Sequence, residues 1–135
     1  KESKADYENA HQRNAREREQ ERQFRASGLA ADLLPAIDNM ERAMAAAKDA
    51  HESGPLVQGI ALVHGQLLDA LKRHGITRIE AAGQPFDPHQ HQAVMQQPAA
   101  DQPPNTVIQV LEQGYMIHDR VLRAAKVIVS TQPTA

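Results

Sequence analysis

Residues 114–129 read GYMIHDRVLRAAKVIV, and this stretch decides the class of fold at the C-terminal end of the chain. Two runs within it, residues 115–117 and 121–129, are mostly apolar and rich in aliphatic side chains, which is typical of short strands. His118 and Asp119 separate the two runs, and Asp is a common turn residue. The stretch therefore predicts two strands joined by a tight turn at His118 and Asp119.

Three further runs upstream have the same texture: residues 76–79, 93–95 and 106–111. Gly, Pro, Asp and Asn residues separate them, with a proline-rich loop at residues 98–105. The intervals are too short to hold helices, so we expect a small, mostly antiparallel sheet. Residues 76–135 are therefore predicted to form one β-domain.

The N-terminal half is predicted to be helical over residues 1–75. Its first 25 residues contain neither Gly nor Pro and are dense in Arg, Glu, Gln and Ala, which favour helices. A heptad-like seam runs along them with few large apolar occupants: Tyr7, Ala10, Asn14, Glu17, Glu21 and Phe24. Such a helix buries too little surface to be stable alone, so we expect it to pair, most simply with a second copy.

An apolar stripe follows this polar segment, at Leu29, Leu33, Ile37, Met40 and Met44. Ser27-Gly28 interrupts the helical pattern, and Pro35 predicts a kink or a new helix start near Asp32. A nearly continuous helix over residues 1–49 would be roughly 70 Å long at about 1.5 Å per residue, so it must project from the globular part.

A last helix is predicted from Pro55 to a C-terminal cap at Gly75. Gly59 and Gly65 lie inside this helix, where each costs roughly 1 kcal/mol relative to Ala. A glycine there indicates the close approach of another surface. That surface is either a helix packed within a dimer or a docked partner, and the helix alone leaves both open. The chain as a whole is predicted to be of the α+β class.

Composition excludes several functions. The 135 residues include 15 basic and 17 acidic ones, a formal net charge of −2, which gives no reason to bind nucleic acid or an anionic membrane. The chain has no cysteine, so disulfides and thiolate zinc sites are excluded. We expect a cytoplasmic protein, since no signal peptide or membrane-spanning run is visible. The sequence starts at Lys1 inside a charged helical pattern, so we also expect that a preceding segment was removed.

The histidines at positions 89 and 91 are the candidates for a metal site, because an i, i+2 pair on a strand can share one face. No third ligand stands at a matching spacing, so we expect one histidine to hydrogen-bond within a turn and the other to be solvated. Neither a phosphate-binding glycine loop nor a nucleophile elbow is present. We expect neither catalytic residues nor a cofactor or metal, and hence no enzyme.

A longer pattern ties the strands together. It combines Phe/Leu-Asp-Pro, a His and an Ala-aliphatic pair with a later Gly-aromatic pair, an acidic residue and aliphatic-Arg-x-Ala/Ser-x-Val-x-Val/Ile. Here its positions are filled by Phe86, Asp87, Pro88, His91, Ala93, Val94, Gly114, Tyr115, Asp119, Leu122, Arg123, Ala125, Val127 and Val129. Upstream segments match as well: residues 6–9, 33–35, 57–60 and 75–76, with Asp38, Glu41, Arg42 and Ala43. From about residue 5 to 129 the chain resembles the GrpE family.

The resemblance implies a parallel homodimer with two long helices side by side. Two short helices per protomer would form a four-helix bundle, and the β-domains would flare out as wings. It also implies a co-chaperone of protein folding and heat-shock response, which contacts the nucleotide-binding domain of a DnaK-type chaperone, opens its cleft and releases ADP. The family's contact positions match here at Arg42, Gly59, Phe86, Pro88, Leu111 and Val129, with Phe24 and Arg13 as further candidates.

His11 and Gln12 depart from the family pattern, which has basic residues there. The electrostatic contact that the long N-terminal helix, the stalk, would make with the chaperone therefore differs. The under-filled helix seam adds the hypothesis that the stalk melts before the rest and acts as a thermosensor. Two other functions stay open at this point. One is a coiled-coil adaptor with the same architecture but no nucleotide exchange, and the other is a His-dependent metalloenzyme.

Overall fold

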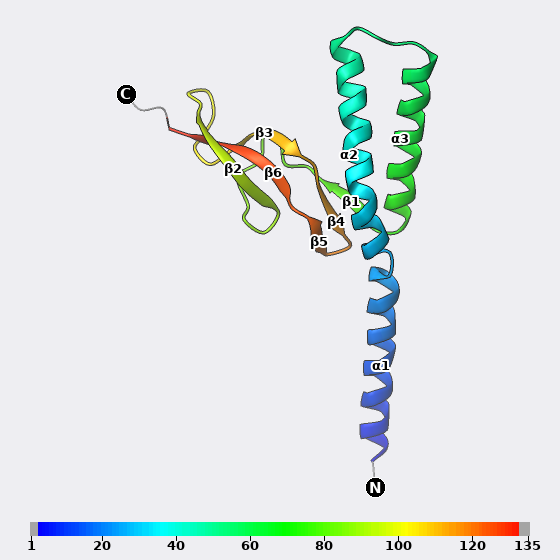
Figure 1. Cartoon of the computed structure of the whole chain (residues 1–135). Coiled ribbons are helices and arrows are strands. Elements are labelled where there is room, and N and C mark those ends of the chain that lie inside the picture. The colour runs from blue at the N-terminus through cyan, green and yellow to red at the C-terminus, as the bar shows by residue number, and fades with distance from the viewer. Residues whose placement is uncertain (1–2, 133–135) are drawn as a thin grey trace.

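The computed structural model describes residues 3–132. Within these residues the chain forms three helices followed by six strands (Figure 1). Helix α1 spans Lys4–Phe24, α2 spans Ser27–Asp49 and α3 spans Pro55–Arg73. Helix α1 continues away from the α2–α3 hairpin, and the strands project to one side near the junction of α1 and α2 (Figure 1). The fold is of the α+β class, as predicted.

Helix α1 starts at a side-chain cap and contains no buried residue. Ser3 precedes it, and the Ser3 hydroxyl accepts a hydrogen bond from the backbone N–H of Asp6 at 3.2 Å. Its residues are exposed except Ala10 and the last residue, Phe24, which are half-buried. Before Phe24, the helix therefore receives almost no stabilisation from the rest of its own chain.

The helical segment breaks at Arg25 and Ala26, just before the predicted interruption at Ser27-Gly28. Pro35 was predicted to cause either a kink or a new helix start near Asp32, and the second of these is wrong, because Pro35 lies inside α2. Proline removes the hydrogen bond to the carbonyl four residues earlier, which belongs to Ala31. Ala31 and Pro35 are both exposed, so water can reach the freed carbonyl and the helix continues.

Helices α2 and α3 lie side by side and share the inner core with part of the sheet. The buried members of this core are Ala30, Leu34, Ile37, Leu71, Ile76, Tyr115 and Ile117. Helix α3 begins with Pro55 in its first turn and is followed by Gly75 at φ 79°, both as predicted. The core joins the helical hairpin to the first strands of the β-domain.

The strands are β1 (Ile76–Ile79), β2 (His91–Pro98), β3 (Val107–Glu112), β4 (Gly114–Ile117), β5 (Arg120–Arg123) and β6 (Ala125–Thr131). They form two three-stranded sheets where a single sheet was predicted: an inner sheet, ordered β1-β4-β5, which contacts the helices, and an outer sheet, ordered β2-β6-β3. Pairing is antiparallel except between β2 and β6, which are parallel. The predicted turn at His118 and Asp119 joins β4 to β5.

The predicted strand over residues 121–129 is in fact two strands, separated at Ala124. The chain passes from the inner sheet to the outer sheet there, and the Ala125 N–H donates to the Gln90 carbonyl at 3.0 Å. A Cβ at Gly114 would lie 2.6 Å from the Ala125 nitrogen. Glycine is therefore required where the two sheets approach each other. Ile79, Ala81, Val107, Ala125, Val127 and Val129 form a second, outer core.

Candidate functional site

An open cleft of about 370 Å³ separates α2 from the end of β3 and the turn after it. Its walls are Asp38, Glu41, Arg42, Val110, Leu111, Glu112 and Gln113. Helical spacing explains one wall, because residues three and four positions apart share a face. Strand alternation explains the other, since it leaves Val110 half-buried and the Leu111 side chain exposed. The cleft brings together two of the predicted contact residues, Arg42 and Leu111.

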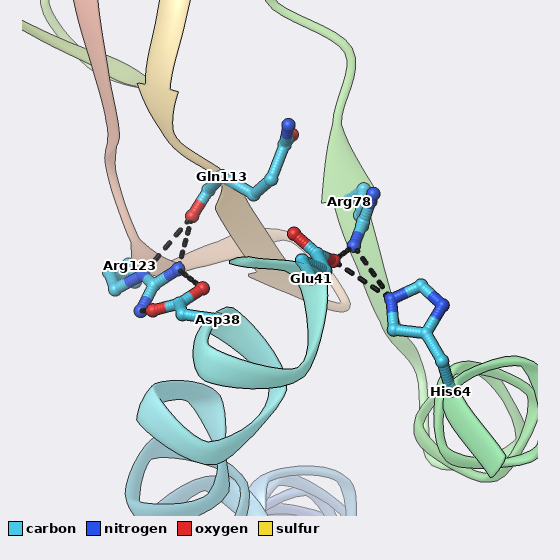
Figure 2. A network of polar contacts seen from close by, with 6 residues as sticks. All are labelled: Asp38, Glu41, His64, Arg78, Gln113 and Arg123. Atoms are coloured by element: carbon cyan, nitrogen blue, oxygen red, sulfur yellow. Dashed lines mark hydrogen bonds and ion pairs between the residues drawn. The ribbon is translucent and has the colours of Figure 1, made fainter. Parts of the chain in front are cut away.

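Arg123 connects the β-domain to α2, which forms one wall of this cleft (Figure 2). Its Nη1 and Nη2 donate to Oδ2 and Oδ1 of Asp38 at 2.6 and 2.9 Å. Its Nε and Nη2 donate to the Gln113 carbonyl at 3.1 and 2.6 Å. The hydrogen bonds with Asp38 raise the pKa of Arg123 above its ordinary value, against the opposing effect of burial. Arg123 thus connects α2, the β3–β4 turn and β5.

A second polar contact lies one turn further along α2 (Figure 2). Glu41 forms an ion pair with Arg78 of β1, and the Glu41 Oε1 lies 2.9 Å from Nε2 of His64 on α3. The three side chains are each less than a third exposed. Asp38 and Glu41 each have a cationic partner, so the negative charges that face the cleft from α2 are already neutralised.

Arg42 is the exception among these charges. It is exposed, and its Nη1 donates to the Asn39 side-chain oxygen at 3.0 Å. Over residues 3–132 it joins no ion pair. Its guanidinium is therefore available to an acidic or carbonyl group of another molecule.

Phe24 lies at a joint where the end of α1 meets the β-domain. Arg120 places its guanidinium 3.8 Å from the centre of the Phe24 ring, and His118 packs edge-on against the ring with centroids 5.6 Å apart. The His118 N–H also donates to the Gly75 carbonyl at 2.8 Å. The end of α1, the end of α3 and the β4–β5 turn meet at this joint.

The other predicted contact residues lie apart from the cleft. Arg13 is exposed on α1, and Gly59 is exposed on α3 with nothing within 4 Å of a Cβ built on it. Phe86 packs partly against the outer core, and Pro88 is exposed beside it. Val129 is only 3% exposed, so its side chain supports the outer core and is closed to direct contact with another molecule.

The histidine pair lies where the chain enters β2: His89 is in the turn before the strand, and His91 is its first residue. Nδ1 of His91 accepts a hydrogen bond from the Asp87 N–H at 3.0 Å, and the His89 side chain is exposed. This matches the expectation of one turn-forming and one solvated histidine. Within the range 3–132, no three His, Asp or Glu side chains are placed to hold a metal ion.

Sequence reasoning missed several residues of the site. Arg78 and Arg120 were given no role, His64 was given none in this contact, and Asp38, Glu41 and Arg123 were noted only as motif positions. The available signal was the i, i+3, i+4 spacing of Asp38, Glu41 and Arg42 beside an apolar stripe, which places three charges on one flank of α2. The partners of Asp38 and Glu41, between 23 and 85 positions away in sequence, cannot be assigned from spacing.

An apolar face remains uncovered on the helical hairpin. A groove of about 240 Å³ there is lined by Ala26, Leu29, Ala30, Leu33, Ile37, Leu67, Ala70, Leu71, His74 and Ile76. Two of these residues, Leu29 and Leu33, are 69% and 37% exposed. Such a face is a feature of helices that pack against another molecule. None of the helices, as far as they are described, has the length and hydrophobicity that crossing a membrane requires.

Comparison with known proteins places this architecture in a family. The family model described as GrpE matches residues 1–131, and the chain belongs to the GrpE family. Protein GrpE of Geobacillus kaustophilus is 48% identical over 126 residues, which are 93% of this chain and 59% of that protein. Protein GrpE of Lactiplantibacillus plantarum is 43% identical over 95% of this chain and 65% of its own length. Protein GrpE of Bacillus subtilis is 42% identical over 93% of this chain and 67% of its own length.

The chain thus spans about 59% of the length of its Geobacillus relative, and the match includes both the helices and the β-domain. The resemblance drawn from the C-terminal signature is confirmed.

Proposed function

We propose that this chain is a co-chaperone that acts as a nucleotide exchange factor for a DnaK-type chaperone and promotes ADP release from its nucleotide-binding domain. Membership of the GrpE family supports the proposal. The observation that carries it is the cleft, in which Arg42 of α2 and Leu111 of the wing face the same space. A protein docked there would touch the stalk and the wing at once.

The mechanism requires no chemistry from the chain itself. An exchange factor must bind the open form of the chaperone's cleft better than the closed, ADP-bound form. Each 1.4 kcal/mol of that preference shifts the open–closed equilibrium by about tenfold. By linkage, ADP must weaken binding of the exchange factor by the same factor. The wing would supply apolar contacts, and Arg42 a charge-assisted hydrogen bond.

The proposed active form is a parallel homodimer. Helix α1 has no buried residue, and the exposed apolar groove on α2 and α3 is the surface that a second copy would cover. The two helical hairpins would then form a four-helix bundle, with residues 1–75 as stalk and bundle and residues 76–135 as the wing. Analytical ultracentrifugation tests this directly, and a monomer at micromolar concentration would contradict it.

The stalk is further proposed to act as a thermosensor. Without core contacts of its own, α1 depends on a poorly filled seam and should melt before the bundle and wing. Circular dichroism should show a helical transition at lower temperature than the main one. A single cooperative transition would defeat the idea.

The decisive experiment measures release of labelled ADP from a DnaK-type chaperone with and without the dimer. Acceleration is expected, and no acceleration by a folded dimer would instead favour a coiled-coil adaptor. Truncation of a strong contact residue typically costs more than about 1 kcal/mol, so Arg42→Ala and Leu111→Ala should each weaken binding several-fold. Met95→Ala removes an equally exposed wing residue outside the cleft and serves as the control. Equal losses in all three variants would mean that the cleft is not the specific contact with the chaperone.

Gly59→Asp tests whether Gly59 of α3 contacts the chaperone or packs against a helix within the dimer. We expect loss of chaperone binding with the dimer intact, because a charged side chain would fill space that the partner occupies. Gln66→Asp is the matched control, since it places the same charge on the same exposed face two turns further along. Loss of the dimer in Gly59→Asp would instead make Gly59 a packing residue of the bundle.

A further inference from the structure

Helix α2 holds the wing through two carboxylates one turn apart. Asp38 pairs with Arg123 of β5, and Glu41 pairs with Arg78 of β1. In the inner sheet, ordered β1-β4-β5, strands β1 and β5 are the two edge strands. Figure 2 shows both contacts reaching from one helix to the two sides of this sheet. We name the two ion pairs together the wing clamp.

The wing clamp adds direction to a contact that is otherwise apolar. Between the helices and the inner sheet, the inner core is built from aliphatic side chains and Tyr115. Burial of apolar surface is not directional, so by itself it leaves the sheet free to rotate or slide by a small amount. Charge-assisted hydrogen bonds with two parallel N–H···O contacts fix orientation as well as distance. The inner core thus supplies a pivot, and the clamp fixes the angle about it.

The Asp38–Arg123 pair is also tied to both walls of the cleft. Asp38 lies one helical turn before Arg42, and the Gln113 carbonyl that Arg123 holds lies two residues after Leu111. Asp38 is 19% and Arg123 21% exposed, so solvent and salt screen the pair less than a surface ion pair. A single guanidinium therefore sets the position of Leu111 relative to Arg42.

We infer that Asp38 and Arg123 are positioning residues for nucleotide exchange, which fix the angle of the wing to α2, with Glu41 and Arg78 as the second fastening. This inference rests on the proposed function. An exchange factor shifts the chaperone towards its open form only if the wing resists displacement when it makes contact. With the clamp broken, the wing still binds through its own surface but yields, so binding is retained while ADP release is no longer accelerated.

The test separates binding from acceleration. Asp38→Asn keeps the side-chain shape and one acceptor but removes the charge, and Arg123→Lys keeps the charge but loses the fork that reaches Asp38 and Gln113 together. Loss of charge-assisted hydrogen bonds in a two-state equilibrium should lower ADP release at saturating exchange factor by about tenfold. The affinity for the chaperone should change by less than about threefold, well under the tenfold that 1.4 kcal/mol would give.

Asp32→Asn is the matched control, because Asp32 is an exposed carboxylate on the same helix and joins no ion pair over residues 3–132. It should release ADP at the parental rate. Equal loss in Asp32→Asn and Asp38→Asn would overturn the inference.

A direct measurement of the angle completes the test. The chain has no cysteine, so spin labels can be placed on α2 and the wing through Ala45→Cys and Gln92→Cys, both at exposed positions. Labelled chains are diluted into unlabelled ones so that each dimer carries one pair. The distance distribution should be narrow in the parent and clearly broader in Asp38→Asn and Arg123→Lys, with an unchanged circular dichroism spectrum.

A distribution that stays narrow in both variants, or one that broadens while ADP release is unaffected, would overturn the inference. If the parent itself fails to accelerate ADP release, the proposed function fails. The distance measurement then still decides whether the clamp fixes the wing.

Discussion

Helix α1 and the inner sheet differ in how much stability they gain from contacts with the rest of their own chain. Helix α1 spans 21 residues without one buried side chain. The inner sheet has only three short strands, yet it shares a core with two helices and is held by two ion pairs at its sides. Length and helix propensity therefore say little about local stability, which follows the contacts that a segment makes. The first region needs a partner to be stable, and the second carries its stability within one chain.

The largest effect should come from the inner core. Leu34 is 1% exposed between α2, α3 and the inner sheet. Leu34→Ala should lower the free energy of unfolding by about 3 kcal/mol, because the substitution leaves a cavity as well as losing buried surface. Urea unfolding at fixed chain concentration measures it. Glu17→Ala in α1 should change stability by less than about 0.5 kcal/mol. Comparable losses of stability in Leu34→Ala and Glu17→Ala would mean that the inner core and α1 do not differ in their contribution to stability.

The joint between the regions should be the next most sensitive. Gly75 has φ 79°, and a Cβ there would lie 2.2 Å from the His118 ring. Gly75→Ala should cost about 2 kcal/mol, since backbone strain of roughly 1–2 kcal/mol adds to the displacement of His118. Gly83 has φ 77° with nothing within 4 Å, so Gly83→Ala reports the strain alone. The difference between the two variants in free energy of unfolding, measured with denaturant, gives the cost of displacing His118. A zero difference would mean that the position of His118 at this joint contributes nothing to stability.

The same contrast explains what could be predicted from the sequence. Periodicity, Pro55 and Gly75 correctly placed the last helix, and the aliphatic runs placed the strands, because these signals are local. The split at Ala124 and the parallel pairing of β2 with β6 depend on contacts with distant residues such as Gln90 and Gly114. Arg42 and Leu111 were named only as contact positions that the family resemblance implies, and the cleft that both line was not predicted. The ion pairs of Arg123 and Arg78 with α2 were not predicted either, because those partners come from elements far apart in the chain.

Filling the seam of α1 should raise stability by a smaller amount. Glu17→Leu places an apolar side chain in the proposed pairing seam, where full burial is worth at least about 1.5 kcal/mol. The early helical transition in circular dichroism should then shift to higher temperature, while the main transition stays in place. Glu19→Leu adds the same side chain two positions away, off the seam, and should not shift it. An identical response from both variants would mean that α1 does not pair through this seam.

The smallest effect should come from the ion pair on the outside of α1. Arg22 and Glu19 lie 2.7 Å apart with side chains 71% and 48% exposed, so water and salt screen them. Arg22→Ala should cost at most about 0.5 kcal/mol, and the cost should disappear in about 1 M salt. The Asp38–Arg123 pair has similar distances but is only a fifth exposed, so Asp38→Asn should destabilise the chain at low and high salt alike. A clamp variant whose cost vanished with salt would show that this contact is a surface ion pair like the one on α1, and the distinction between the two regions would then rest on apolar packing alone.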